Sequence, residues 1–335
     1  MKRFVPPRHY SCMKPRMMVV ALCGIVLASP ARAAVLVSAD ESAPIIVTLM
    51  THTDGRNYSS GNTFLNDARR IRWGMGLYER LGAKMNLEAS KEFADASVAR
   101  DPTILRDAES RHGVGTHCND AGALDDESVA SLTARIAANK LAVDARLTNA
   151  ANNASVSGIC SRNDWVTASS KAGFKIVDAA VGYCYLSMSE CARPADWTDE
   201  EIQLKYYHDA APYGFENRMS PIRLRNSLDF IADAEAVAVQ TLSNGELGEL
   251  DSLFEGRNTC PCTLTVDDFG IVYAAIDYLI AHKAANEVGR INVHVPVSLL
   301  VPGNDGLLRS FLNGLKAKPI VFGTQKDVVD TYAVW

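Results

Sequence analysis

The chain has 335 residues, and its formal net charge of −5 is spread without long charged runs. No basic cluster interleaves with aromatic residues, which excludes the positively charged surface typical of nucleic-acid-binding proteins. The length is enough for one large domain with its own hydrophobic core.

The first 33 residues have the pattern of an export signal. Basic residues precede a short apolar stretch at 17–28, and Ala31-Arg32-Ala33 matches the small-x-small pattern of a cleavage site. This stretch is shorter than the ~20 residues that a membrane-spanning helix needs. We therefore expect a signal peptide at 1–33, a periplasmic or secreted domain at 34–335, and no membrane span after cleavage. An uncleaved N-terminal anchor is the alternative.

The remaining cysteines favour disulfides. Two of the eight cysteines lie in the predicted signal peptide and would be removed with it. An even number of remaining cysteines in an exported chain is typical of disulfide pairing. Cys184 with Cys191 is the preferred local bridge, whereas Cys260 and Cys262 lie too close together for an easy mutual bond. A zinc site built from these thiols is the alternative reading.

Apolar runs alternate with amphipathic stretches along most of the chain. We predict the following elements in chain order: strand 45–50, helix 63–81 ended by Gly82, strand 84–89, a short helix opened by Asp101-Pro102, strand 113–117, helix 128–150, strand 156–160, helix 165–172, strand 174–177, an irregular stretch at 187–225, strand 237–242, helix 267–285, strand 291–297, helix 307–315, strand 320–322 and helix 326–332.

This alternation predicts the fold class. Seven or eight β-then-α units without a linker-like break indicate a parallel sheet covered by helices. We predict an α/β fold, a single-domain (β/α) barrel that is distorted and seven- or eight-stranded. An open doubly wound sheet is the alternative. Gly74-Met75-Gly76 lies inside a helical pattern and is therefore no nucleotide-binding fingerprint.

Polar side chains follow the first strand at its end. The run from residue 44 stops on His52 and Asp54, and residues two apart on a strand point to the same side. Ligands and catalytic groups of α/β folds sit at this end of the strands. Imidazole together with carboxylate favours a metal, whereas an ordinary Asp54-Gly55 turn is the structural alternative.

Two more histidine-bearing segments follow apolar runs. His112 and His117 are five residues apart, so at most one of them points into a shared site, and we choose His117 because it ends its strand. Asp120 in the next turn is a further candidate ligand. Gly113 and Gly115 indicate that this strand passes close to another group. His294 lies in a β-branched run and is a candidate general acid or a buried core residue.

A polar segment at 160–165 is the next candidate. Arg162 follows a predicted strand, Trp165 comes shortly after, and Trp197 lies in the irregular stretch. An arginine and aromatic rings near a metal would orient a carboxylate and stack on a sugar. Capping of the following helix by a polar side chain of this segment explains the pattern equally well.

These motifs together resemble the polysaccharide deacetylase (NodB-like) family. Thr51-His52-Thr53-Asp54-Gly55 resembles its first motif, T-F-D-D-G, and the segment at 111–117 resembles its second motif up to the first ligand histidine. Arg162 resembles the arginine of the third motif, Asp196-Trp197 its D-x-x-D-W region, and Val293-His294 its last strand.

The resemblance implies a metal-dependent carbohydrate deacetylase of periplasmic or secreted location. It implies a divalent ion, expected to be zinc, on Asp54 and His117, a general acid at His294, and an acetylated polysaccharide or oligosaccharide as substrate. Two departures stand out, because Thr53 occupies the position of the family's base and Ala121 that of its second ligand histidine. His52 is our candidate for one missing role and Asp120 for the other.

Two further hypotheses come from other classes of protein. The departures also fit a non-catalytic carbohydrate-binding protein on a degenerate barrel. A glycoside hydrolase would need two carboxylates at strand ends, for which the sequence offers Asp54 with Asp178 or Glu216.

Overall fold

The computed structural model describes the chain at residues 42–53, 58–118, 127–195, 197–205, 222–228, 239–242, 247–248 and 263–334. One compact unit covers residues 42–335. The predicted signal peptide lies outside the described residues. Every helix in the described ranges is too short or too polar to cross a membrane.

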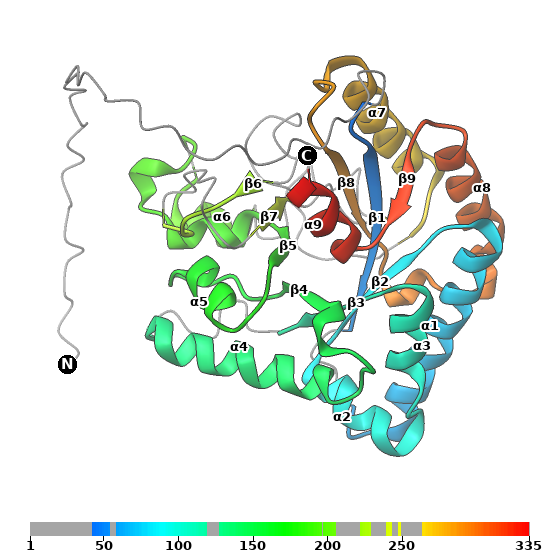
Figure 1. Cartoon of the computed structure of the whole chain (residues 1–335), viewed down its shortest axis with the longest axis horizontal. Helices are drawn as coiled ribbons and strands as arrows, with labels where there is room; N and C mark the ends of the chain where they lie inside the picture. Colours follow the sequence, from blue (N-terminus) through cyan, green and yellow to red (C-terminus); the bar gives the residue numbers. More distant parts are fainter. Residues whose placement is uncertain are drawn as a thin grey trace, which may run out of the picture. The chain divides into compact units, whose positions relative to one another are not determined.

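A curved, mostly parallel sheet forms the centre of this unit (Figure 1). Its strands are β1 (Ile45–His52), β2 (Met85–Ala89), β3 (Gly113–His117), β4 (Asn153–Ser157), β5 (Ile176–Ala180), β6 (Ile222–Arg223), β7 (Val239–Leu242), β8 (Gly289–His294) and β9 (Val321–Gly323). The order β7-β5-β4-β3-β2-β1-β8 is parallel throughout, while β6 joins β7 antiparallel and β9 pairs with the first half of β1. The predicted distorted (β/α) barrel is confirmed.

An ion pair across the interior shows how strongly the sheet curls. Arg290 on β8 and Asp178 on β5 lie five strands apart in the sheet order, which would separate them by about 24 Å in a flat sheet. Their side chains instead meet, with Nη2 and Oδ1 2.6 Å apart. The sheet must therefore wrap around a closed interior.

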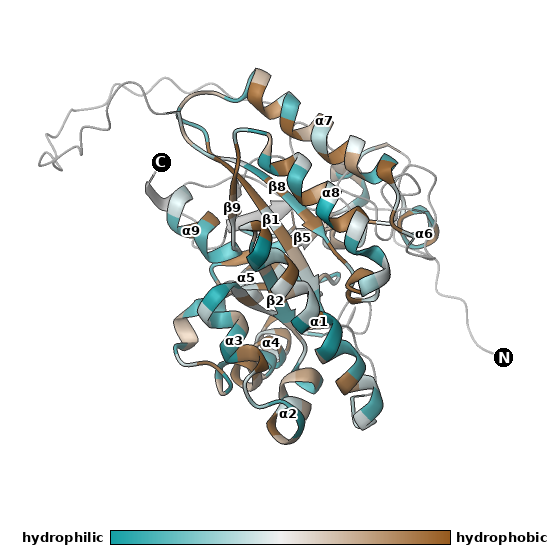
Figure 2. Ribbon diagram, turned by 90° about the vertical axis from the view of Figure 1, so that its right-hand side faces the viewer, coloured by the Kyte–Doolittle hydropathy of each residue, from teal (hydrophilic) through white to brown (hydrophobic). Residues whose placement is uncertain are grey.

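Most helices cover the outside of the sheet (Figure 1), whereas the last one packs Val328 against the inward-facing Ile46 and Ile176. The helices are α1 (Gly61–Leu81), α2 (Lys91–Arg100), α3 (Ile104–Arg111), α4 (Val129–Asp144), α5 (Trp165–Lys171), α6 (Asp199–Leu204), α7 (Val266–His282), α8 (Asp305–Lys316) and α9 (Gln325–Val334). Several of them, such as α8, alternate apolar and polar residues along their length (Figure 2), as expected for helices with one face on the core.

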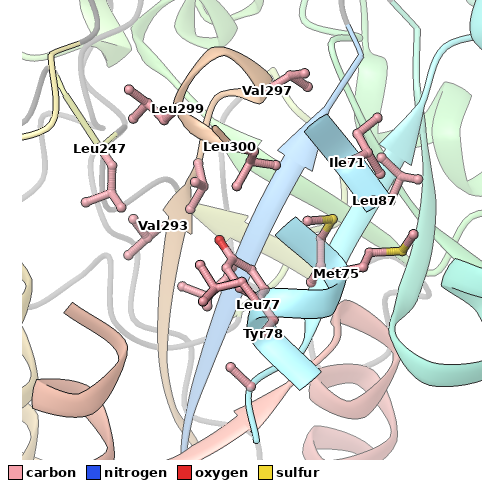
Figure 3. Packing of buried hydrophobic residues seen from close by; sticks show 14 of the residues in the cluster. Ile71, Met75, Leu77, Tyr78, Leu87, Leu247, Val293, Val297, Leu299 and Leu300 are labelled. Carbon is pink, nitrogen blue, oxygen red and sulfur yellow. The ribbon is translucent and has the colours of Figure 1, made fainter. Parts of the chain in front are cut away.

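The outward face of the sheet is apolar. Leu87 and Val293 point toward the helices, where they join one continuous cluster with residues such as Ile71 and Met75 of α1 (Figure 3). Leu49 belongs to the same cluster. This cluster is the main hydrophobic core. It fixes which face of each strand points outward, because side chains alternate between the two faces of a strand.

The inward face is polar above an apolar floor. Ile46, Ile176 and Val328 of α9 form part of a small cluster that is the floor. Above it, β1 also places Met50 inward and β3 places Gly113 and Gly115 there, but most of the other inward positions carry polar side chains. These side chains are Thr48 and His52 of β1, Asn86 and Glu88 of β2, His117 of β3, Ser155 and Ser157 of β4, Asp178 of β5, and Arg290, Asn292 and His294 of β8.

Several helix boundaries differ from the predicted ones for local reasons. The helix α2 was missed, and Asp101 ends it rather than capping the next helix, since its carboxylate binds Arg72 of α1 through two bonds of 2.6 Å. Helix α3 starts only at Ile104. The long helix predicted at 128–150 ends at Asp144. Strands β4 and β5 are shifted by two or three residues from their predicted positions.

The preferred disulfide was wrong. Cys184 pairs with Cys160, not with Cys191, and Cys191 is also disulfide-bonded. The Cys160–Cys184 bond joins the segment after β4 to the short helical stretch after β5. These two segments are 24 residues apart in sequence but adjacent in the fold, which a rule based on short spacing does not detect.

Candidate functional site

Three imidazole rings from three strand ends meet at the carboxyl end of the barrel. His52 of β1 lies in the middle, with its ring centroid 4.1 Å from that of His117 of β3 and 4.1 Å from that of His294 of β8. The ring planes are within 11° and 13° of parallel, so the three rings form a stack. His117 and His294 are buried, whereas His52 is partly exposed. The structure thus joins three of the predicted site residues.

The backbone and side chain of β4 hold His117 in place. Its Nδ1 lies 2.8 Å from Ser157 Oγ, and Gly158 packs against the flat side of the ring. Gly158 has φ +66°, and a Cβ at this position would lie 2.6 Å from Cε1 of His117. Glycine is therefore needed here both for the left-handed backbone and for the close approach to the ring.

The second histidine of the same segment has a different role. His112 ends α3, at the opposite end of β3 from His117. Its Nδ1 accepts a hydrogen bond of 3.2 Å from the Met85 amide, and its Nε2 lies 3.2 Å from a Glu79 carboxylate oxygen. Burial lowers the pKa of His112, although Glu79 opposes this effect. His112 is a structural residue, which agrees with the expectation that only one of the pair enters the site.

Glu88 lies inside the barrel, directly beside the first strand. Its Cα is the register partner of His52, and its side chain is fully buried. Oε1 accepts hydrogen bonds from Ser155 Oγ over 2.7 Å and from Asn86 Nδ2 over 3.3 Å. Burial raises the pKa of Glu88 well above its usual range and Asp178 adds to the rise, while hydroxyls of Ser157 and Ser155 and the charge of Arg290 oppose it.

Two glycines on β3 make room for this polar interior. A Cβ at Gly115 would lie 2.8 Å from Glu88 Oε1 and would overlap Ser155 Oγ, and a Cβ at Gly113 would meet the side chains of Asn86 and Thr324. The prediction that this strand passes close to other groups is confirmed.

Gly115→Ala is expected to lower the free energy of unfolding by about 1–3 kcal/mol, because the added methyl group overpacks the interior. Urea denaturation measures the change. Gly306→Ala is the control, since it lies in α8 with no described atom within 4 Å of its Cβ position. Alanine should leave stability unchanged or slightly higher there. Equal values for both variants would contradict the proposed close contact.

The other predicted site residues are placed as follows. Trp165 is fully buried and donates from Nε1 to the Cys184 carbonyl over 3.2 Å, so the predicted sugar-stacking role is corrected to a packing role. Trp197 is also nearly buried and packs edge-on against Tyr185. Arg162 is ion-paired with Asp199 of α6. Asp54 and Asp120 lie outside the described residues.

The described donors alone do not fit a metal ion. Metal coordination needs lone pairs that converge on one point, whereas lone pairs in stacked imidazoles lie in nearly parallel planes. Among the residues that the structure describes, no three histidine, cysteine or carboxylate side chains form a metal-binding group. The predicted metal ligands Asp54 and Asp120 therefore stay predictions from the sequence.

The sequence reading missed the interior residues that support the stack. Asn86, Glu88, Arg290 and Asn292 lie in or beside segments that the sequence analysis predicts as strands without assigning a role to their polar residues. The signal that could have found them is the polar residue at every second position, which predicts a strand with one polar face. That pattern is short in each strand and becomes informative only when several strands are compared.

Comparison with solved structures supports the fold. A putative polysaccharide deacetylase from Mycobacterium smegmatis matches with a TM-score of 0.52 at 10% identity, over 88% of this chain and 92% of that one. Puue allantoinase matches with a TM-score of 0.55 at 10% identity, over 87% and 90%.

A 4-alpha-glucanotransferase from Thermococcus litoralis also matches, with a TM-score of 0.52 at 14% identity. The match covers 87% of this chain but 40% of the glucanotransferase, so the chain spans less than half of that enzyme. No family model and no curated protein matches the sequence. At these identities the likeness establishes the barrel fold and nothing further.

Proposed function

We propose that this protein is an exported hydrolase that removes N- or O-linked acetyl groups from a polysaccharide or oligosaccharide. The observation that carries the proposal is the stack of His52, His117 and His294 at the carboxyl end of a (β/α) barrel. This is the end at which enzymes with related architectures place their reacting groups. The fold shared with a putative polysaccharide deacetylase and an allantoinase supports hydrolysis of a carbonyl compound.

The chemistry follows from the properties of imidazole. Near neutral pH a histidine can either accept or donate a proton, so neighbouring histidines can act as base and acid in one reaction. We assign His52, the more exposed ring, to the removal of a proton from the attacking water. His294 then protonates the leaving amine or hydroxyl group. Arg162 is proposed to orient the base, and its ion pair with Asp199 supplies no direct support for this role.

A zinc-like divalent ion on Asp54, His117 and Asp120 is a separate proposal, supported by the resemblance of the sequence motifs. Elemental analysis of the purified full chain tests it. About one equivalent of metal that is lost in His117→Ala would support this ligand set, whereas a metal content unchanged by that substitution would contradict it.

Export is supported by the signal-like segment at 1–33 and by the Cys160–Cys184 disulfide, since disulfides persist in oxidising compartments. N-terminal sequencing of the protein recovered from the periplasm or medium tests the proposal. A mature chain that starts at Ala34 is the expected result, and retention of residue 1 on the exported protein would count against cleavage.

The activity is tested by incubating the full mature chain with a panel of N- and O-acetylated glycans and measuring free acetate. We expect release from at least one class of glycan by the wild type and none by the His52→Gln/His294→Gln double variant. Acetate release that survives in the double variant would refute the histidine stack as the reaction centre.

A carbohydrate-binding protein without catalysis is the second candidate, and one observation favours it. Thr53, at the position of the family's base, is fully buried; its Oγ1 accepts a hydrogen bond of 2.8 Å from the Ser90 amide. It therefore has a structural role at the start of α2. Binding of a glycan on the panel without any acetate release would select this candidate over the hydrolase.

A further inference from the structure

A short segment next to His117 belongs to no helix or strand. We call residues 158–164 the backing segment, because a Cβ on its first residue, Gly158, would lie only 2.6 Å from Cε1 of His117. Ser157 comes directly before this segment, and its Oγ lies 2.8 Å from Nδ1 of the same ring. The Ser157 carbonyl also accepts a hydrogen bond of 3.0 Å from the Cys118 amide. A shift of the backing segment would therefore move the ring at one side of the histidine stack.

The first cross-link on the backing segment is covalent. Cys160, two residues after Gly158, forms the disulfide with Cys184 in the short helical stretch Gly182–Ser187. Both cysteines are buried, and the Cys184 carbonyl accepts a hydrogen bond of 3.2 Å from Trp165 Nε1. The disulfide thus attaches the backing segment to a second, closely packed loop.

The second cross-link is an ion pair and lies two residues further along the chain. Arg162 binds the carboxylate of Asp199, at the start of α6. Arg193 holds Asp199 from the other side, with Nη1 and Oδ1 2.6 Å apart, and Arg193 itself donates to the Met188 carbonyl over 2.7 Å. Because the disulfide fixes Cys160 and the ion pair fixes Arg162, the backing segment has little freedom to leave the ring.

We propose that the Cys160–Cys184 disulfide and the Arg162–Asp199 pair are positioning groups of the site, which hold the backing segment against His117 and so keep the three rings stacked. This inference rests on the proposed function for its effect on the reaction, whereas its structural content is independent of that function. The expected effect on rate is large, because a reacting group misplaced by about 1 Å can cost about 10²-fold even when the change lies far from the chemistry.

Hydrogen exchange of the full mature chain without substrate tests the structural content. The wild type is compared with the Cys160→Ala/Cys184→Ala double variant, and exchange is resolved by peptide. We expect a loss of protection in the peptides that cover 113–118 and 158–164, and unchanged protection in a peptide of α8 at 305–316. Such a local pattern is typical of a segment that opens without unfolding of the whole domain.

Ile136→Ala is the matched control. Ile136 of α4 is fully buried in the same hydrophobic cluster as the two cysteines, but its side chain forms no cross-link. Its truncation should lower stability through the cavity that it leaves, without a selective effect on the backing segment. Equal exchange patterns in Ile136→Ala and in the double variant would overturn the inference, since the effect would then be general destabilisation.

The kinetic test measures acetate release by the same variants. We expect kcat of the double variant to fall by about 10- to 100-fold with little change in KM, and kcat of Ile136→Ala to stay near the wild-type value. An unchanged kcat in a folded double variant would overturn the inference. If the wild type releases no acetate, the proposed function fails, and the exchange pattern still decides the positioning.

Arg162→Met decides the question if the double variant does not fold. It removes only the ionic cross-link, and Asp199 keeps its contact with Arg193. We expect a smaller loss of protection that is confined to the peptides covering 113–118 and 158–164, and unchanged exchange in both peptides would overturn the inference. This variant is measured by exchange alone, because Arg162 also has the proposed role of orienting the base.

Discussion

Replacing His117 with glutamine is expected to lower the rate of acetate release by about 10²- to 10⁴-fold, because His52 and His294, the proposed base and acid, lose the full ring stack that positions them and with it their usual contribution. His117 occupies one side of the histidine stack and is held by Ser157 Oγ at 2.8 Å. Glutamine can keep one polar contact but has no ring to stack on His52. The measurement is the initial rate at saturating glycan, combined with circular dichroism to confirm folding.

His112→Gln is the matched control for this prediction. It removes a second histidine of the same strand segment, which is also buried but lies at the other end of β3. We expect near wild-type activity and a lower free energy of unfolding, because the contacts to the Met85 amide and to Glu79 are lost. If both variants lose activity equally, the effect reflects general destabilisation of β3 and the site assignment fails.

Arg290→Met is expected to lower the free energy of unfolding by about 3–5 kcal/mol, the largest effect on stability that we predict. Arg290 and Asp178 are both almost completely buried, and their atoms are 2.6 Å apart. Methionine leaves the Asp178 carboxylate inside the barrel without this guanidinium, beside neutral groups such as Asn292 Nδ2 at 3.0 Å. Urea denaturation monitored by circular dichroism gives the free energy.

Two comparisons make this prediction specific. Lys91→Met breaks the exposed pair of Lys91 and Asp95, also 2.6 Å apart, and should cost only about 0.3–0.5 kcal/mol. The double variant Arg290→Met/Asp178→Leu should recover much of the loss, because it removes the stranded charge as well. A cost for Arg290→Met as small as that for Lys91→Met would mean that the cross-barrel ion pair does not form.

The Arg290–Asp178 ion pair also argues against one part of the glycoside hydrolase hypothesis. Asp178 was offered as one of two catalytic carboxylates, but it is buried and bound to Arg290, Asn292 and Gln325. A carboxylate held in this way supports the fold and is not available as a nucleophile or acid at the mouth of the barrel. Asp54 and Glu216 lie outside the described residues.

Local sequence signals determined most of the elements. Gly82 ends α1 in a left-handed conformation, as predicted, and the strand predicted at 113–117 is exact. Such signals work because a helix cap or a short extended run depends mainly on neighbouring residues. The alternation of strands and helices predicted a parallel sheet and favoured the barrel, since parallel strands joined by helices admit few arrangements, but it left an open doubly wound sheet as the alternative.

The identity of the residues at the strand ends was also determined by the sequence, because apolar runs that stop on a histidine are visible without coordinates. The tertiary structure decided what those residues touch. Curling of the sheet places Asp178 of β5 against Arg290 of β8, and the pairing of β4 with β5 brings Cys160 close to Cys184, although no spacing rule connects either pair. The tertiary structure also places Trp165 in the core. The polar face of β2, which carries Glu88, points toward the histidine stack. These contacts depend on which strands become neighbours across the interior, and the closure of the whole sheet fixes that relation.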